Sequence, residues 1–258
     1  MNLPNAPELV FETRLGGVLT LTLGDPPAHP LSLDMIAALH RAIGAANADA
    51  EVRVIVLYGP GKIFCAGHDM KEIKRHRLDA DQGRVFVERL FADCAAMMQA
   101  LATSPKPTIA MIEGIATAGG LQLMCSCDVV FATPNARFSL PGVDNRGFCT
   151  TPAVAVGRSL GRRQVMEMAL SGDKFGADWA LAAGLINRIV PSEELTDTVA
   201  EFATKLAERH APAITLGKAT LDRQLALPLD QAYEQATQVM IEHFMDPERI
   251  ARDLANEL

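Results

Sequence analysis

Two glycine-rich segments carry the residues whose types and spacing could do chemistry. They are Gly59–Lys71 (GPGKIFCAGHDMK) and Gly114–Leu123 (GIATAGGLQL), and each follows a short apolar run. Glycine lets a ligand approach the backbone closely, and the free peptide N–H groups at the start of a helix carry partial positive charge. Together these features are typical of a site that stabilises negative charge on a ligand oxygen. Glycine after a strand also forms ordinary turns, so neither segment alone predicts a function.

The two segments, in this order and spacing, resemble the paired motifs of the crotonase (enoyl-CoA hydratase/isomerase) superfamily. Two later segments extend the resemblance over nearly the whole chain: Arg137–Pro141 (RFSLP), and Ser171–Ile186 with its AAGLI ending. Pro141-Gly142 and the FCTTP segment at 148–152 are similar to the subgroup described as enoyl-CoA hydratase domain-containing protein 3.

The resemblance implies a fold, a ligand and an assembly. The fold would be an α/β, crotonase-like spiral of repeated ββα units, assembled into homotrimers or homohexamers largely through C-terminal helices. The ligand would be an acyl-CoA thioester, with coenzyme A entering as part of the substrate and without a prosthetic group. The peptide N–H groups of His68 and Gly119 match the family's oxyanion hole, the pair of donors that binds the thioester oxygen. Two preorganised donors would stabilise an enolate or a tetrahedral intermediate.

The same motifs imply the contacts with coenzyme A. Lys62 and Lys71 match family positions that contact the nucleotide phosphates, and ammonium groups on a loop suit phosphate as point charges. The backbone of Cys65 and Ala66 matches the stretch that lines the adenine. Asp69 and Gly120, from the same two motifs, complete the expected coenzyme A contacts.

Both glutamates that hydratases of this family use for proton transfer are replaced. The position that matches the first is Gln122, and the position that matches the second is Gly142. An amide does not accept a proton near neutral pH, and glycine has no side chain. Each acid–base group contributes ~10²–10⁴ to a rate, so we expect ordinary enoyl-CoA hydration to be inefficient. Each oxyanion-hole donor would still contribute roughly 10²–10³.

Three functions remain open. The chain could be an enoyl-CoA hydratase or isomerase with unusual acid–base groups, or an acyl-CoA binding and regulatory protein without catalysis. It could also hydrolyse or decarboxylate a thioester through Asp144, although a loop carboxylate near Arg146 is more often a surface ion pair. Cys149 would need a lowered pKa to attack a thioester, and a buried thiol is the simpler interpretation. The His68 side chain lies where most relatives carry a small residue.

Short apolar strands alternate with helices along the first part of the chain, which predicts a layered α/β domain with crossover connections. Ser32 can cap the first helix. The expected strands and helices are a hairpin at 8–23, strands at 52–57, 108–112, 129–132, 137–140 and 186–190, and a helix at 85–101. From residue 192 the pattern is helical, so we expect a spiral core over residues 1–195 and a helical region over residues 196–258.

Composition excludes several classes of protein. With 31 acidic and 24 basic residues the net charge is -7, the wrong sign for a nucleic-acid-binding surface. No apolar run is long enough to span a membrane, and the first residues lack the pattern of a secretory signal, which predicts a cytoplasmic protein. The five cysteines are an odd number, and their spacing is not that of metal ligands. We therefore expect neither a set of disulfides nor a metal site.

Overall fold

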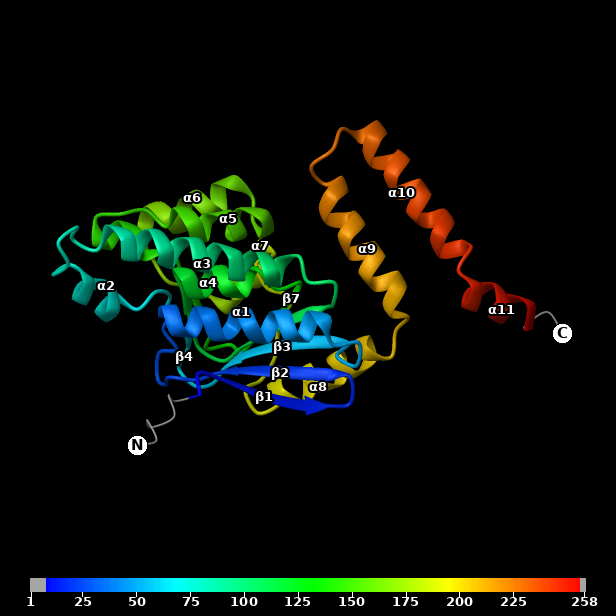
Figure 1. Ribbon diagram of the computed structural model, residues 1–258, viewed down its shortest axis with the longest axis horizontal. Coiled ribbons are helices and arrows are strands. Elements are labelled where there is room, and N and C mark those ends of the chain that lie inside the picture. Colours follow the sequence, from blue (N-terminus) through cyan, green and yellow to red (C-terminus); the bar gives the residue numbers. More distant parts are fainter. Residues whose placement is uncertain (1–7, 256–258) are drawn as a thin grey trace. The chain divides into compact units, whose positions relative to one another are not determined.

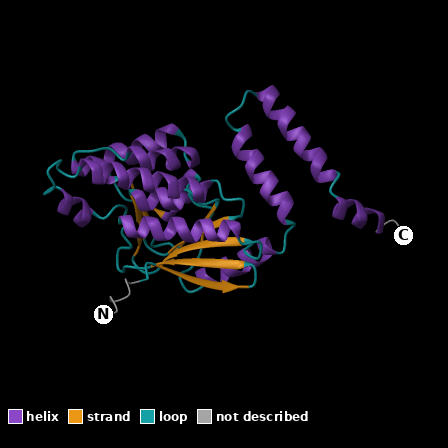
Figure 2. Cartoon of the chain, in the orientation of Figure 1, coloured by secondary structure: helices purple, strands orange, loops and turns teal. Residues whose placement is uncertain are grey.

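A computed structural model describes residues 8–255, in which strands and helices alternate along the chain (Figures 1 and 2). In chain order the elements are β1 (Val10–Leu15), β2 (Val18–Leu23), α1 (Leu33–Ala48), β3 (Val54–Gly59), β4 (Ile63–Cys65), α2 (Met70–His76), α3 (Arg84–Ala102), β5 (Thr108–Ile112), β6 (Ile115–Thr117), α4 (Gly119–Cys125), β7 (Val129–Ala132), β8 (Arg137–Ser139), the 3₁₀ helix η1 (Pro141–Asn145), α5 (Thr150–Ser159), α6 (Arg162–Ser171), β9 (Phe175–Gly176), α7 (Ala177–Ala183), β10 (Arg188–Ile189), α8 (Leu195–Ala207), α9 (Ala211–Gln224), α10 (Leu229–Phe244) and α11 (Pro247–Ala255). Residues 1–7, on which the expectation of no secretory signal partly rests, lie outside the described range.

The described strands form a larger and a smaller sheet. The larger sheet has the order β1-β2-β3-β5-β7-β10, and its neighbours pair in parallel except for the β1–β2 hairpin. The smaller sheet has the order β4-β6-β8-β9, with parallel pairing from β4 to β8. Parallel neighbours need crossover connections, which the helices supply. The layered α/β arrangement expected from the sequence is therefore present.

Alternation along the strands of the larger sheet separates two apolar layers. Val54 and Val56 of β3 pack with Leu195, Val199 and other residues of α8 on one face. Their neighbours Ile55 and Leu57 belong to the main core on the other face, together with the buried side of α1. Successive side chains of a strand point to opposite faces, so a strand covered on both faces must be apolar throughout.

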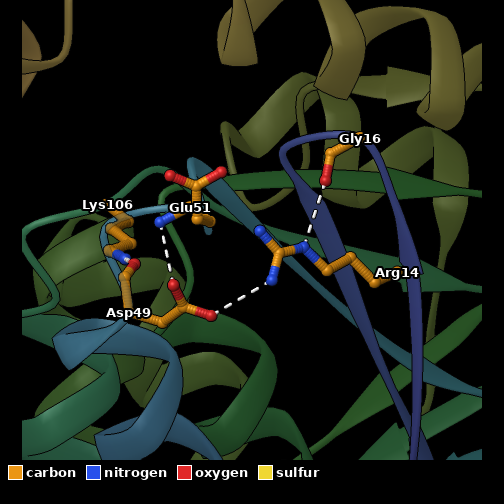
Figure 3. A network of polar contacts seen from close by, with 5 residues as sticks. All are labelled: Arg14, Gly16, Asp49, Glu51 and Lys106. Atoms are coloured by element: carbon orange, nitrogen blue, oxygen red, sulfur yellow. Dashed lines mark hydrogen bonds and ion pairs between the residues drawn. The ribbon is translucent and has the colours of Figure 1, made fainter.

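A polar network ties the β1–β2 hairpin to the end of α1 and the start of β5 (Figure 3). The guanidinium of Arg14 donates to the Gly16 carbonyl oxygen at 3.2 Å and to Asp49 at 3.1 Å. Asp49 also accepts from the Glu51 amide at 2.8 Å, and its carbonyl accepts from the Lys106 ammonium. The Arg14–Asp49 pair is partly exposed, so it positions the loops more than it stabilises the fold.

The sequence signals for the first helix and the hairpin are confirmed. Ser32 accepts a hydrogen bond from the Met35 amide at 3.1 Å and caps α1. The hairpin turns at Gly16 and Gly17, between β1 and β2. The third strand begins at Val54 instead of residue 52, because the Arg53 and Val54 amides both donate to the Gly17 carbonyl where the strand begins.

The chain divides into two compact units after Ala207. The division lies later than the boundary expected after residue 195, because α8 packs against strands of the larger sheet and belongs to the first unit. In the second unit, α9 and α10 pack against each other. Most apolar side chains of α10 and α11 are exposed there, including Ile241, Phe244 and Leu254, whereas Ala232 is buried.

Candidate functional site

The smaller sheet brings the two glycine-rich motifs and the Gly142 loop to one edge. Its strands β4, β6 and β8 are parallel, and their carboxyl ends lead into residues 66–69, residues 118–122 and residues 141–149. Ligands of parallel α/β sheets bind outside the carboxyl ends of the strands. We call residues 67–69 and 118–122 the amide side of the candidate site, and residues 141–149 the loop side.

On the amide side, the backbone hydrogen bonds beside His68 point its N–H away from Leu31, with which it forms a parallel bridge. The Leu31 amide donates to the Gly67 carbonyl at 2.8 Å, and the Asp69 amide donates to the Leu31 carbonyl at 3.2 Å. Successive peptide groups of an extended chain point in opposite directions, so the N–H of the intervening His68 faces away from Leu31.

Gly67 and Gly119 meet at the centre of the amide side. Gly67 has φ +83, and a Cβ on it would lie 2.8 Å from the Gly119 nitrogen. Among the described residues, neither the His68 N–H nor the Gly119 N–H has a hydrogen-bond acceptor. Buried backbone donors are nearly always paired, so two unpaired donors at one contact indicate a place where a ligand oxygen binds.

A strained residue holds Gly119 in place. Ala118 has φ 50 and ψ -119, a conformation that favours glycine, and it precedes the first residue of α4. Its amide donates to the Ser139 carbonyl at 3.1 Å, and its carbonyl accepts from the Gln122 amide at 3.1 Å. Strain of this kind persists where the surrounding structure fixes it, and it is concentrated at functional sites. Sequence reasoning missed Ala118, because an alanine before two glycines carries no signal of positive φ.

Gly120 sets the distance between α4 and β4. A Cβ at Gly120 would overlap the carbonyl oxygen of Cys65, so no other residue fits without a backbone shift. The Cys65 side chain is fully buried, and burial raises the pKa of its thiol to about 12. Cys65 therefore contributes packing and backbone to this edge, and its thiol stays protonated at neutral pH.

Two polar side chains of the amide side, those of His68 and Gln122, each bury one polar atom without a partner within residues 8–255. His68 Nε2 and Gln122 Oε1 have no hydrogen-bond partner among the described residues, and Gln122 is 6 % exposed. Burial lowers the pKa of His68 to about 4, so its imidazole is neutral at physiological pH. An unsatisfied buried polar atom costs about 1–3 kcal/mol, which makes both atoms candidates for ligand contact. His68, Gly119 and Gln122, predicted from the sequence, thus lie on one side of the site.

On the loop side, main-chain atoms crowd Gly142, the position that the sequence resemblance matches to the second glutamate. A Cβ at Gly142 would lie 2.6 Å from the Cys149 nitrogen and 2.8 Å from the Phe148 carbonyl carbon. Cys149 is buried, and burial raises the pKa of its thiol, so it is a poor nucleophile near neutral pH. The simpler interpretation of Cys149 as a buried thiol agrees with this environment.

Asp144 lies at the exposed surface of the loop side. Its two carboxylate oxygens are each 3.1 Å from where a Cβ of Gly172 would be, at the end of α6. The side chain is exposed, and no described residue forms an ion pair with it, including Arg146. The surface ion pair considered from the sequence is therefore absent from the described contacts.

Some of the residues expected to contact coenzyme A form hydrogen bonds within the fold, and others are exposed without such contacts. The Asp69 carboxylate caps α2 by accepting from the Lys71 amide at 2.8 Å and the Glu72 amide at 3.3 Å. The Ala66 amide donates to the Ala28 carbonyl at 2.9 Å. Lys62 and Lys71 are exposed, and their ammonium groups contact no acidic side chain among the described residues. These lysines remain free to bind an anion.

Residues 8–255 contain no cluster of three or more His, Cys, Asp or Glu side chains that could hold a metal ion. Over the same range, no helix has the length and apolar character needed to cross a membrane.

Comparison with known proteins agrees with this architecture. The model of the enoyl-CoA hydratase/isomerase family matches residues 13–254. The chain belongs to this family. Enoyl-CoA hydratase domain-containing protein 3, mitochondrial, from Rattus norvegicus is 36% identical over 238 residues, which are 92% of this chain and 78% of the rat protein. The crotonase fold and the resemblance to this subgroup, both predicted from the sequence, are confirmed.

Solved structures of family members superpose on nearly the whole chain. An enoyl-CoA hydratase/isomerase family protein from Silicibacter pomeroyi has a TM-score of 0.89 and 60% identity, covering 93% of this chain and 100% of its own. Human enoyl Coenzyme A hydratase domain-containing protein 3 has a TM-score of 0.89 and 33% identity, covering 96% and 98%. The rat relative's name places that protein in mitochondria, so the cytoplasmic location expected for this chain stays a prediction.

Proposed function

We propose that this chain binds acyl-CoA thioesters and stabilises negative charge on the thioester oxygen with the peptide N–H groups of His68 and Gly119. The supporting observation is that both donors lack an acceptor and adjoin the Gly67–Gly119 contact. Membership of the enoyl-CoA hydratase/isomerase family supports the thioester ligand. Donors fixed by backbone contacts need no reorganisation as charge develops, which is the condition for effective oxyanion stabilisation.

The acid–base chemistry of the proposed site differs from that of a two-glutamate hydratase. Gln122 can hold a water or hydroxyl through its amide but cannot take a proton near neutral pH, and Gly142 offers no group at all. The proposed activity is therefore that of an enoyl-CoA hydratase or isomerase type enzyme whose rate depends on the oxyanion hole. Ordinary hydration should be slow.

Steady-state assays on enoyl-, dienoyl- and malonyl-CoA thioesters test the proposal. We expect turnover of at least one thioester above the buffer rate. Turnover of none of them, together with calorimetric binding of an acyl-CoA, would replace the enzyme by a binding protein. Failure of every coenzyme A ester to bind would remove the proposal altogether.

The second candidate, a non-catalytic acyl-CoA binding or regulatory protein, is favoured by the loop side. The backbone of Phe148 and Cys149 leaves no room for a side chain at position 142. The loop therefore has neither the second acid nor the space for it. The amide side does not depend on that space. This candidate predicts acyl-CoA affinity without turnover.

Hydrolysis or decarboxylation of a thioester would depend on Asp144. The replacement Asp144→Asn keeps the size of the side chain and removes the carboxylate. If Asp144 is the reactive group, the variant loses hydrolysis or decarboxylation and keeps its affinity for the thioester. Unchanged rates would exclude this reaction, and the exposed position of Asp144 leads us to expect them.

The remaining contacts with the ligand and between subunits are proposed as well. Lys62 and Lys71 would contact the phosphates of coenzyme A, while Cys65, Ala66, Asp69 and Gly120 would shape the adjoining backbone. Exposed apolar residues of α10 and α11, such as Phe244 and Leu254, support assembly into trimers or hexamers through the C-terminal helices. Sedimentation of the purified full chain would measure the subunit number.

A further inference from the structure

Residues 60–62, which we call the connector, join the two sheets. They follow β3 of the larger sheet and precede β4 of the smaller sheet. Gly61 and Lys62 are exposed and lie beyond the carboxyl end of β3, the edge at which parallel sheets bind ligands. Gly61 has φ +89, a conformation that glycine adopts at no steric cost. An exposed segment of this kind keeps one conformation only where other parts of the chain hold it.

The Glu113 side chain holds the middle of the connector. One of its oxygens accepts from the Gly61 amide at 2.8 Å, and the other accepts from the Tyr58 hydroxyl of β3 at 2.8 Å. Burial and then the hydrogen bond with Glu113 raise the pKa of Tyr58 to about 12, so this hydroxyl stays protonated and can donate. The Glu113 carbonyl accepts from the buried Thr133 hydroxyl at 2.7 Å, which fixes the backbone of Glu113 in turn.

Both ends of the connector are held as well. Nε2 of the buried His29 lies 3.1 Å from the Pro60 carbonyl oxygen, and its Nδ1 lies 2.7 Å from the Gly24 carbonyl oxygen. The Lys62 carbonyl accepts from the Ile115 amide at 3.0 Å. Three consecutive residues therefore have their backbone held by other segments, although Lys62 itself is exposed.

A fixed backbone beneath an exposed lysine suits the binding of an anion. Ordering a mobile segment on binding costs free energy, and a segment that is already fixed avoids that cost. Glu113 is partly buried, so its two hydrogen bonds can be removed by substitution without changing the connector itself. Its contribution to ligand binding can therefore be measured separately from that of Lys62.

We propose that Glu113, together with Tyr58, is a positioning residue for Lys62, and that it fixes the connector where the phosphates of a coenzyme A thioester bind. This inference rests on the proposed function, because it places those phosphates at Lys62. Glu113 acts through the backbone of Gly61 and touches no part of the ligand. It accordingly contributes to affinity for the nucleotide part of the thioester and not to affinity for the acyl-pantetheine part.

The test compares two thioesters by calorimetry on the full chain. Butyryl-CoA carries the phosphates, whereas butyryl-pantetheine lacks them, so the ratio of the two affinities measures the contribution of the nucleotide. We expect the wild-type chain to prefer butyryl-CoA. Glu113→Leu removes both acceptors and should lower the ratio about fivefold, within the range for ordering a segment on binding. Its affinity for butyryl-pantetheine should equal that of wild type.

Three further variants separate the hydrogen bonds from general damage. The amide of Glu113→Gln can accept from Gly61 and donate to the Tyr58 oxygen, so this variant should keep the wild-type ratio. Glu201→Leu, at an exposed position of α8, is the matched control and should also keep it. Tyr58→Phe removes one of the two hydrogen bonds and should lower the ratio about twofold. If Glu113→Leu does not fold, an unchanged ratio in Tyr58→Phe overturns the inference.

A double-mutant cycle shows whether Glu113 acts through Lys62. Lys62→Met should itself lower the ratio, and Glu113→Leu added to it should lower the ratio no further, because the positioned ammonium is then absent. An equal loss from Glu113→Leu in both backgrounds would overturn the inference. So would a Glu113→Leu variant that binds both thioesters more weakly by the same factor, since Glu113 would then only stabilise the fold.

The wild-type measurements separate this inference from the function on which it rests. Equal affinity for butyryl-CoA and butyryl-pantetheine would overturn the inference and leave thioester binding intact. Failure of the wild-type chain to bind either thioester would overturn the proposed function itself.

Discussion

The amide side and the loop side of the candidate site differ from the two-glutamate site that the sequence resemblance implies, and they would do so in different ways. At Gln122, the position that the resemblance matches to the first glutamate, the side chain is buried and its amide oxygen has no partner among the described residues. At Gly142 the backbone of Phe148 and Cys149 fills the space into which any side chain would project. Relative to the implied site, the first difference would be one of chemistry at constant shape, and the second would be one of loop shape. Placing a glutamate at position 122 is therefore a different problem from placing one at position 142.

The largest effect is expected on the amide side, from Gly120→Ala. The added Cβ would overlap the Cys65 carbonyl, and backbone cannot move aside cheaply. We expect a loss of roughly 3 kcal/mol or more in the free energy of unfolding, and loss of acyl-CoA binding. Gly157→Ala in α5 is the control, since a Cβ there meets nothing within 4 Å. It should stabilise the chain by ~1 kcal/mol in the same urea titration. Equal stability of the two variants would contradict the close approach.

Gln122→Glu tests whether a carboxylate at position 122 is enough to raise the rate of hydration. Because Glu and Gln are of similar size, the variant should fold, and we expect its rate of crotonyl-CoA hydration to rise about 10²-fold, the lower end for one acid–base group. Hydration followed by absorbance of the enoyl thioester measures it. Gln122→Met, which supplies no base, should give no rise. A folded Gln122→Glu variant with the wild-type rate would show that the missing second acid alone limits hydration.

Gly142→Ala probes the loop side. The methyl group would lie 2.6 Å from the Cys149 nitrogen, so the loop must shift, at a cost of ~1–3 kcal/mol in the free energy of unfolding. Gly147→Ala in the same loop is the matched control, because its Cβ would lie at an ordinary 3.6 Å from the Gly142 carbonyl oxygen. Chemical denaturation of both variants measures the difference. A Gly142→Ala variant as stable as the control would mean that the loop can make room for a second acid.

The smallest effect is the pH dependence that His68 gives to stability. Its pKa is lowered from 6.5 to about 4 by burial, so between these values the unfolded chain binds a proton that the folded chain does not. Stability is therefore complete above pH 6.5 and falls as the pH drops toward 4. Between pH 6.5 and 5.5 the loss should be about 1 kcal/mol. Unfolding curves of wild type and His68→Phe should differ by this amount, and parallel curves would contradict a buried neutral imidazole.

The sequence by itself determined the elements and the family. Alternation of apolar and polar residues predicted the hairpin, and a short apolar run predicted the buried strand Thr108–Ile112, because a strand covered on both faces has to be apolar. The two glycine-rich motifs identified the backbone that meets at Gly67 and Gly119, since close approach of main chains requires glycine. Those signals are local, and a sequence carries them directly.

Only the tertiary structure decided what surrounds Gln122 and Gly142, the two positions that the resemblance matches to glutamates. The sequence showed Gln122 and Gly142 but not that the amide oxygen is buried without a partner, or that Phe148 and Cys149 occupy the space beside Gly142. It also gave no sign of the strained Ala118 or of the unpartnered Nε2 of His68. Burial and pairing depend on atoms from strands and helices far apart in the chain. The spacing of residues in the sequence describes only neighbours along the chain.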